Sequence, residues 1–271
     1  MLFIAPWLLG CLVFLVFPLG FSLYMSFHSV QILPTRIATK FVGFDYYREI
    51  LFSSSVLYEN LFPFLREMAV MIPVILVFAL MIAIFLNQRF WGRSFFRAVF
   101  FLPVIFTTGY VVTEFVNQGQ GSLGFLENAR FSGYLDMFLG SGGWGEAVKN
   151  VLNRFVLILW YSGVQILIFL AGRQTISPSA YEAARIDGAS PWDVFWKITL
   201  PAMTPFLFLN LIYTVIDMFT FPFNPIIQLI AMKNYGYNSA LAWIYFVIIL
   251  IVLGLFVALF ARIVRSRPKM E

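Results

Sequence analysis

Six long apolar segments constrain the fold of this chain more than any other feature. Each has close to the roughly 20 residues that an α-helix needs to cross about 30 Å of hydrocarbon. They are residues 2–27, 67–86, 99–116, 151–170, 201–222 and 239–261. Every run is continuously apolar instead of alternating with a period of two, which predicts helices and not the strands of a barrel. The predicted fold class is therefore an all-α integral membrane protein, a single domain of six transmembrane helices over residues 1–271.

The composition excludes most other classes of protein. Hydrophobic residues make up 61% of the chain and charged residues only 11%, against about 45–50% and about 25% in soluble domains. A soluble enzyme or nucleic-acid binder is thereby excluded. The single cysteine, Cys11, and single histidine, His28, exclude a disulfide framework, a Cys/His metal site and a Cys–His catalytic pair. None of the five lysines follows a glycine, so no phosphate-binding loop is expected and no cofactor is predicted.

The distribution of positive charge predicts the orientation in the membrane. Residues 87–98, 171–199 and 262–271 are short segments that together carry ten of the 18 Lys and Arg residues. Such segments face the cytoplasm, and an even number of spans then places both termini there. The first span has no basic start and no small-residue cleavage site, so we do not expect a cleaved signal peptide. Because Met1 opens directly into this span, a truncated cytoplasmic tail is expected. The glycine-rich residues 117–145 are predicted to be an irregular outer loop.

The cytoplasmic segment 171–199 is patterned as two short helices. Ser179 and Glu182 have the spacing of a capping box, which would begin the first helix. Gly188 can adopt the left-handed conformation that ends it. Residues 190–193, Ser-Pro-Trp-Asp, place a cap, a first-position proline and an acid at the start of a second helix. The segment is therefore predicted to be a compact helix–glycine–helix unit.

This unit has two possible roles. Its apolar side chains suit docking onto a cytoplasmic partner by knob-in-groove contacts; they are Tyr181, Ile186, Val194 and Phe195. The alternative is an amphipathic hairpin that rests on lipid headgroups. Local sequence alone leaves both possibilities open.

The same unit resembles a known family motif. Glu182-Ala-Ala, Gly188 and Ile198-x-Leu-Pro201 match the spaced EAA loop of permease subunits in binding-protein-dependent ABC importers. Residues 41–48, 93–103, 160–165 and 170–174 extend the resemblance to the carbohydrate-importing, maltose-permease-like branch. The chain departs from that branch by lacking a basic N-terminal tail, by Tyr46 in place of an asparagine, and by lacking Gly-Gly-Pro in residues 223–238.

The resemblance implies an import function in the bacterial plasma membrane. In such importers the short loop helix sits in a cleft of a cytoplasmic ATPase, whose closure on ATP drives the spans from inward-facing to outward-facing. The residues that would couple to the ATPase are Tyr181, Glu182, Ala183, Ala184, Asp187 and Gly188. The implied partners are a second, homologous permease, two ATP-binding cassette ATPases and an extracytoplasmic sugar-binding protein. The chain itself is then a non-catalytic translocation subunit.

A polar stripe on the fifth span is the candidate substrate path. Asn210, Tyr213, Thr214 and Asp217 recur at helical spacing and share one face. Three residues of the fourth span could face this stripe: Trp160, Tyr161 and Gln165. The alternative is a polar seam that holds helices together. Two rival functions also stay open: the same scaffold with a non-sugar cargo, and an ion-coupled secondary transporter with Asp217 as the ion site.

Overall fold

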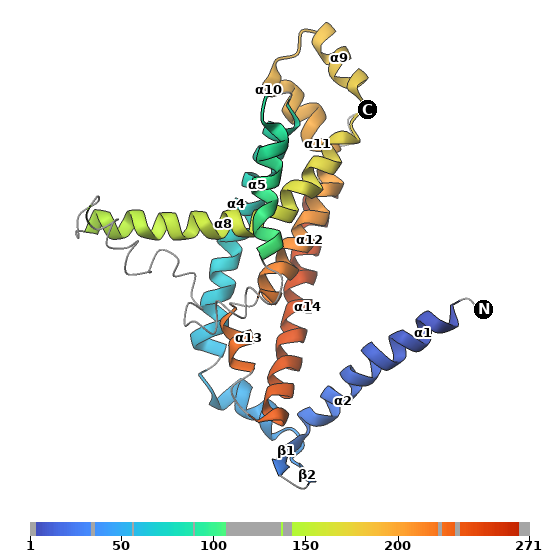
Figure 1. Ribbon diagram of the computed structural model, residues 1–271, viewed down its shortest axis with the longest axis vertical. Coiled ribbons are helices and arrows are strands. Elements are labelled where there is room, and N and C mark those ends of the chain that lie inside the picture. The colour runs from blue at the N-terminus through green and yellow to red at the C-terminus, as the bar shows by residue number, and fades with distance from the viewer. Residues whose placement is uncertain are drawn as a thin grey trace. The chain divides into compact units, whose positions relative to one another are not determined.

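The computed structural model is mostly helical (Figure 1). It describes residues 4–33, 36–55, 57–88, 90–106, 137, 143–221, 224–230 and 234–265. Five segments of this part of the chain are long and apolar enough to span a membrane: Ala5–Ser26, Leu57–Asn87, Leu157–Gln174, Thr204–Ile230 and Tyr235–Arg262. These segments confirm a helical membrane fold. The predicted third span, residues 99–116, lies mostly outside the described residues.

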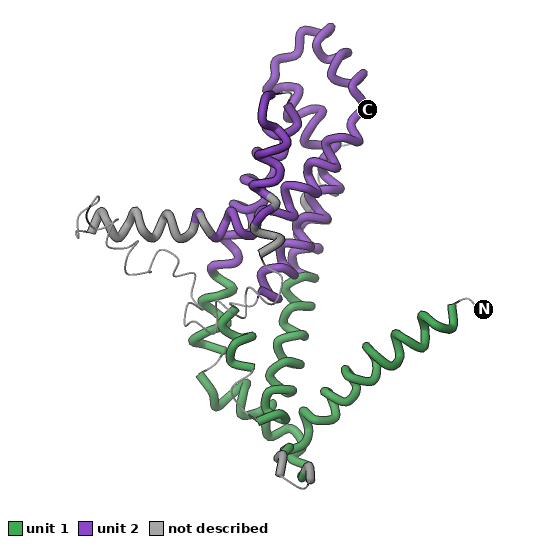
Figure 2. The backbone as a smooth tube through the Cα atoms, viewed as in Figure 1, with its two compact units in different colours: residues 1–66, 224–254 green, residues 67–223, 255–271 purple. Residues whose placement is uncertain are grey.

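The chain forms two compact units (Figure 2). Unit 1 consists of residues 1–66 and 224–254, and unit 2 consists of residues 67–223 and 255–271. Two long helices, α4 (Phe62–Asn87) and α14 (Tyr235–Arg265), contribute to both units.

Unit 1 begins with the first span, which runs through helix α1 (Ala5–Cys11), the π-helical segment η1 (Leu12–Val16) and helix α2 (Phe17–Ser26). Ser26 is the one buried residue of this span. Its Oγ accepts a 2.7 Å hydrogen bond from the Tyr47 hydroxyl. The apolar side chains of the span therefore find little cover within unit 1.

A two-stranded hairpin follows the first span, and the sequence pattern did not predict it. Strands β1 (His28–Leu33) and β2 (Arg36–Phe41) pair antiparallel, with His28 opposite Phe41. The start of α14 approaches this hairpin closely, because a Cβ at Gly236 would lie 2.0 Å from the His28 carbonyl oxygen. Only glycine fits at that contact.

The core of unit 1 lies where short helices pack on α14. These helices are α3 (Asp45–Arg48), the π-helical segments η2 (Glu49–Ser53) and η3 (Leu57–Leu61), and α13 (Pro225–Ile230). Ile50 is fully buried against Tyr237, Leu241 and Ile244 of α14. Asn234 caps α14 by accepting a 2.7 Å hydrogen bond from the Tyr237 amide, which fixes where the last span begins.

In unit 2, helix α4 turns sharply into helix α5 (Arg93–Phe106). Gly92 makes this turn at a φ of +91°, a conformation that favours glycine. Arg97 of α5 reaches back, and its Nη2 donates a 3.2 Å hydrogen bond to the Leu86 carbonyl. A positive charge thereby satisfies a free carbonyl in the last turn of α4.

Helix α8 (Gly143–Gln174) packs on α5 and on α12 (Thr204–Thr220) in unit 2. The prediction of an irregular loop over residues 117–145 is wrong at its end, since residues 143–145 are helical. Most of that loop lies outside the described residues. Near the other end of α8, a Cβ at Gly172 would lie 2.4 Å from the Phe206 ring. The missing side chain lets α8 and α12 approach closely.

Candidate functional site

The interspan loop, residues 175–203, joins α8 to α12 and carries the candidate coupling residues. Its elements are α9 (Pro178–Ile186), α10 (Pro191–Val194), the π-helical segment η4 (Phe195–Thr199) and α11 (Leu200–Ala202). The predicted capping box at Ser179 is wrong. Helix α9 begins at Pro178, with Ser177 as the N-cap residue. A serine followed by a first-position proline is itself a helix-start signal, and here it outweighs the capping-box spacing.

The predicted stop at Gly188 is confirmed. Gly188 has a φ of +71°. Its amide donates a 3.1 Å hydrogen bond to the Arg185 carbonyl, and the Ala189 amide donates a 2.9 Å bond to the Ala184 carbonyl. These two bonds define a Schellman motif, in which a left-handed residue satisfies the last free carbonyls of a helix.

The predicted start of the second loop helix is also confirmed. Ser190 caps α10, because its Oγ accepts a 3.2 Å hydrogen bond from the Asp193 amide. Asp193 in turn forms a 2.8 Å ion pair with Lys197. The Lys197 ammonium and the Ser190 hydroxyl together hold the pKa of the Asp193 carboxyl below its usual range. This exposed network fixes the turn that follows Gly188.

Helix α9 presents one face to solvent. Glu182, Ala183, Ile186 and Asp187 are exposed, as is Gly188 after the helix, and the Ile186 side chain is 86% exposed. Ala184 is buried on the opposite side. Four of the six predicted coupling residues therefore share the open surface with Ile186. We call Glu182, Ala183, Ile186, Asp187 and Gly188 the exposed face of α9.

Tyr181 lies outside this exposed face. It is half-buried, and its hydroxyl accepts a hydrogen bond from Nη1 of Arg173 in the last turn of α8. The same hydroxyl is 3.1 Å from Oγ1 of the buried Thr199 in η4. Sequence reasoning missed Arg173 and Thr199, and a basic residue in the last helical turn was the one available signal.

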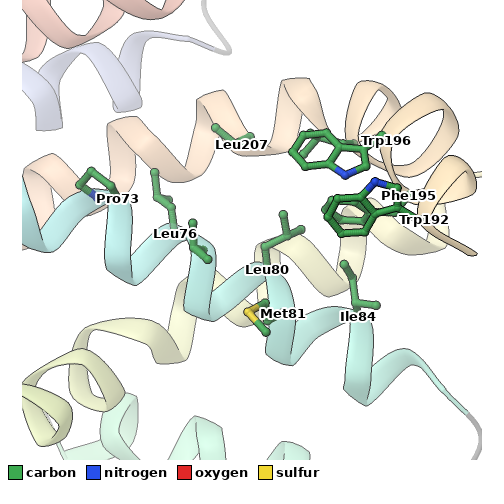
Figure 3. A pocket seen from close by; sticks show the side chains of 11 residues that line it. Pro73, Leu76, Leu80, Met81, Ile84, Trp192, Phe195, Trp196 and Leu207 are labelled. Atoms are coloured by element: carbon green, nitrogen blue, oxygen red, sulfur yellow. The ribbon is translucent and has the colours of Figure 1, made fainter.

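The apolar side of the interspan loop borders a pocket of about 630 Å³ (Figure 3). All of its lining side chains are hydrophobic. Leu80 and Ile84 of α4 face Trp192, Phe195 and Trp196 of the loop. Indole rings are typical of the boundary between hydrocarbon and water, and two of them, Trp192 and Trp196, line this pocket.

Polar side chains of the candidate substrate path join α8 to α12. The Gln165 side-chain amide donates a 3.2 Å hydrogen bond to Thr214 Oγ1. The Asn210 side-chain amide donates another hydrogen bond of 3.2 Å to the backbone carbonyl of Gln165. All three residues have no exposed surface. We call Gln165, Asn210 and Thr214 the polar seam; its buried cross-helix bonds stabilise the packing of the two spans.

The residues of the candidate substrate path outside the polar seam do not share its closed network of cross-helix hydrogen bonds. Asp217 and Tyr213 are half-buried, and the Asp217 carboxyl lies beside the Gln165 amide. Tyr161 is buried, with its ring centroid 4.8 Å from that of Phe221. Trp160 forms no hydrogen bond to this group among the described residues. The predicted stripe thus divides into a closed seam and a partly open pair, Tyr213 and Asp217.

Two acceptor atoms of the polar seam stay unused. Gln165 Oε1 and Asn210 Oδ1 are buried without a hydrogen-bond partner among the described residues. Such atoms can bind a hydroxyl or water that reaches them. The described residues contain no group of three or more His, Cys, Asp or Glu side chains that could hold a metal ion.

These features define a multi-pass helical membrane protein with a structured, solvent-exposed loop between two packed spans. The family described as "Binding-protein-dependent transport system inner membrane component" matches residues 50–270. The chain belongs to this family, which confirms the resemblance found in its sequence.

Known relatives match over most of their length. A probable ABC transporter permease protein of Bacillus subtilis, YesP, is 32% identical over 94% of this chain and 88% of its own. The multiple sugar-binding transport system permease protein MsmF of Streptococcus mutans is 28% identical over 89% of this chain and 87% of its own. A bacterial ABC transporter for alginate import shares the fold, with a TM-score of 0.60 at 20% identity over 95% of this chain and 93% of that chain.

Proposed function

We propose that this chain is the translocation subunit of a bacterial sugar importer driven by ATP hydrolysis in separate subunits. The observation that carries the proposal is the exposed face of α9, held on a helix that a Schellman motif ends at Gly188 and that Tyr181 anchors on its other side. A rigid helix with a free face suits docking into a groove of another protein. Family membership supports the same conclusion.

The proposed orientation places the interspan loop and both chain termini in the cytoplasm, as the basic segments predict. The exposed face of α9 then docks onto an ATPase. Small residues such as Ala183 allow close approach, and Glu182 is available to pair with a basic group. The chain performs no covalent chemistry, and each complex contains two ATPases and a second, homologous permease.

A sugar is the proposed cargo, and an extracytoplasmic sugar-binding protein is the proposed donor. The names of related permeases support this choice: MsmF belongs to a multiple sugar-binding system, and AraP of Bacillus subtilis to one for arabinooligosaccharides. A non-sugar cargo is the second candidate. It is favoured by the sn-glycerol-3-phosphate permease UgpA of Escherichia coli, which is 28% identical over 80% of this chain.

The proposed sugar path runs along α12 beside the polar seam. Asp217 and Tyr213 are its accessible groups, with the carboxylate accepting hydrogen bonds from sugar hydroxyls and the phenol ring stacking on a sugar face. Gln165, Asn210 and Thr214 serve mainly to hold α8 to α12, which is the alternative role raised by the sequence. Trp160 and Tyr161 complete the fourth-span side.

Uptake into proteoliposomes tests the proposal. The complex with its ATPases, second permease and binding protein is assayed with maltose, arabinose oligosaccharides, alginate oligosaccharides and sn-glycerol 3-phosphate. A β-branched residue at the φ of +71° of Gly188 costs of order 1–3 kcal/mol. We therefore expect Gly188→Val to abolish ATPase co-purification and uptake, with Gln174→Ala as the matched control.

Two outcomes would contradict the proposal. Normal uptake by Gly188→Val would remove the docking role of the interspan loop. Uptake that needs no ATPase and collapses with an ionophore would instead support an ion-coupled transporter centred on Asp217.

A further inference from the structure

One phenol connects the two spans that flank the interspan loop. The Tyr181 hydroxyl on α9 accepts a hydrogen bond from Arg173 Nη1 at the end of α8. The same hydroxyl lies 3.1 Å from Oγ1 of Thr199, which comes just before α11 and α12 in the chain. The Arg173 guanidinium carbon also lies 4.3 Å from the centroid of the Tyr181 ring. A charge-assisted hydrogen bond and a cation–π contact therefore act on the same side chain.

The surroundings leave these groups little freedom to change partners. Thr199 is 4% exposed, and Arg173 Nε is buried with no acceptor among the described residues. One residue before Arg173, the backbone of Gly172 is packed against the Phe206 ring of α12. Breaking the phenol's bonds would thus leave buried polar groups unsatisfied, which is costly.

The two sides of α9 consequently have different roles. The exposed face is free for a partner, whereas Tyr181 holds the helix to both spans. A displacement of α9 must either move α8 and α12 or break the bonds of Tyr181. This assigns Tyr181 a role other than contact with the ATPase.

We propose that Arg173, Tyr181 and Thr199 form a latch that transmits movement of α9 to spans α8 and α12. This inference rests on the proposed function, because an ATPase must supply the movement. The three are positioning residues: they touch neither cargo nor nucleotide, and they make the loop and the two spans move together.

A reporter cysteine on α12 tests the latch without knowledge of the cargo. Cys11 is replaced by serine, and the exposed Thr220 at the end of α12 by cysteine. The purified complex with its ATPases is labelled with a membrane-impermeant maleimide, with and without ATP and vanadate. In Tyr181→Phe, which keeps the ring and loses the hydroxyl, we expect the nucleotide-dependent change in labelling rate to fall about tenfold, within the range for losing a charge-assisted hydrogen bond.

The matched control is Ser179→Ala, which removes a hydroxyl of the same helix whose 2.6 Å contact is to Ser177 and not to a span. Its reporter response should equal that of the unmodified complex. ATPase co-purification and ATP hydrolysis should persist in Tyr181→Phe, whereas a purely structural defect would reduce them. Thr199→Val should give a smaller loss, and Tyr181→Phe combined with Thr199→Val no more than Tyr181→Phe alone.

The latch is overturned if Tyr181→Phe and Ser179→Ala show the same nucleotide response as the unmodified complex. It is also overturned if Tyr181→Phe loses its ATPases. If nucleotide did not change the labelling rate in the unmodified complex, the proposed function would be contradicted instead. Failure of the latch and failure of the proposed function are therefore distinguishable.

Discussion

The first span and the α8–α12 pair are both apolar, but they differ in burial and in polar contacts. In the span Ala5–Ser26, large side chains such as Phe14, which is 83% exposed, are left uncovered within unit 1. In α8 and α12, buried amides and hydroxyls face each other across the helix contact. Lipid solvates an apolar side chain as well as another helix does, so packing within a membrane depends on close fit and polar contacts.

The two kinds of span therefore differ in whether they have a fixed partner within the chain. A span with an apolar surface all round can be lipid-facing or can pack against another chain. A span with a polar seam has a fixed partner, so we expect the two helices to move together. The interspan loop connects the two members of that fixed pair.

The largest expected effect comes from the closest contact of the pair. Gly172→Ala would place a Cβ 2.4 Å from the Phe206 ring, and such overpacking typically costs 1–3 kcal/mol. We expect a clear loss of thermal stability in detergent, measured by a tryptophan-fluorescence melt. Gly254→Ala, which meets open space, is the control, and Phe206→Ala should rescue the variant. A stable Gly172→Ala without rescue would mean that α8 and α12 do not touch there.

The polar seam should give the next largest effect. Thr214→Val removes the acceptor of the Gln165 amide, and interhelical bonds of this kind average about 0.6 kcal/mol with a maximum near 1.7. Thr220→Val is matched to it, because among the described residues the Thr220 hydroxyl bonds to carbonyls of its own helix, Ile216 and Asp217. We expect Thr214→Val to unfold at lower denaturant concentration than Thr220→Val. Equal midpoints would show that the seam does not hold the spans together.

A smaller effect is expected from the turn that leads into α12. The Asp193 pKa is lowered in the folded chain by Lys197 and Ser190, so the ionised form is stabilised by folding. That contribution is present above the usual aspartate pKa and is lost as the pH falls through the lower folded value. The melting temperature of Asp193→Asn should therefore lie below that of the parent at pH 7 and converge with it at an acidic pH below the folded pKa of Asp193. A constant difference at both pH values would assign the effect to something other than this charge.

The smallest effect should come from the first span. Phe14→Ala removes a side chain with no cover in this chain, so its folding stability in detergent should change by less than about 0.5 kcal/mol. Phe169→Ala in α8, where Phe169 is fully buried, is the contrasting variant and should lose clearly more stability, because it opens a cavity between packed side chains. Similar losses of folding stability in Phe14→Ala and Phe169→Ala would show that the first span and α8 do not differ in packing.

The sequence predicted those features that depend on long apolar runs and on local turn chemistry. The predictions for Gly188 and Ser190 were correct, because a left-handed residue and a helix cap are determined by their immediate neighbours. The α9 start at Ser177 was missed because two serines competed for the same role.

Long-range contacts could not be predicted in the same way. The approach of α14 to the β1–β2 hairpin brings Gly236 beside His28, which lies far from it in the chain. The bonds of Tyr181 to Arg173 and Thr199 span eight and 18 residues of chain. The polar stripe was predicted as a face of one helix, but its division into a closed seam and an open pair depends on where Gln165 of α8 lies. Helical periodicity describes one helix and gives no information about its neighbour.

The most direct test of the account is the location of the exposed face of α9. Ile186→Cys in a Cys11→Ser background places a single thiol at a position that is 86% exposed. An impermeant maleimide is applied to right-side-out and inside-out vesicles, with and without the ATPase subunits. The account predicts labelling only in inside-out vesicles and protection when the ATPases are bound. Labelling from the outer side, or labelling that the ATPases leave unchanged, would contradict it.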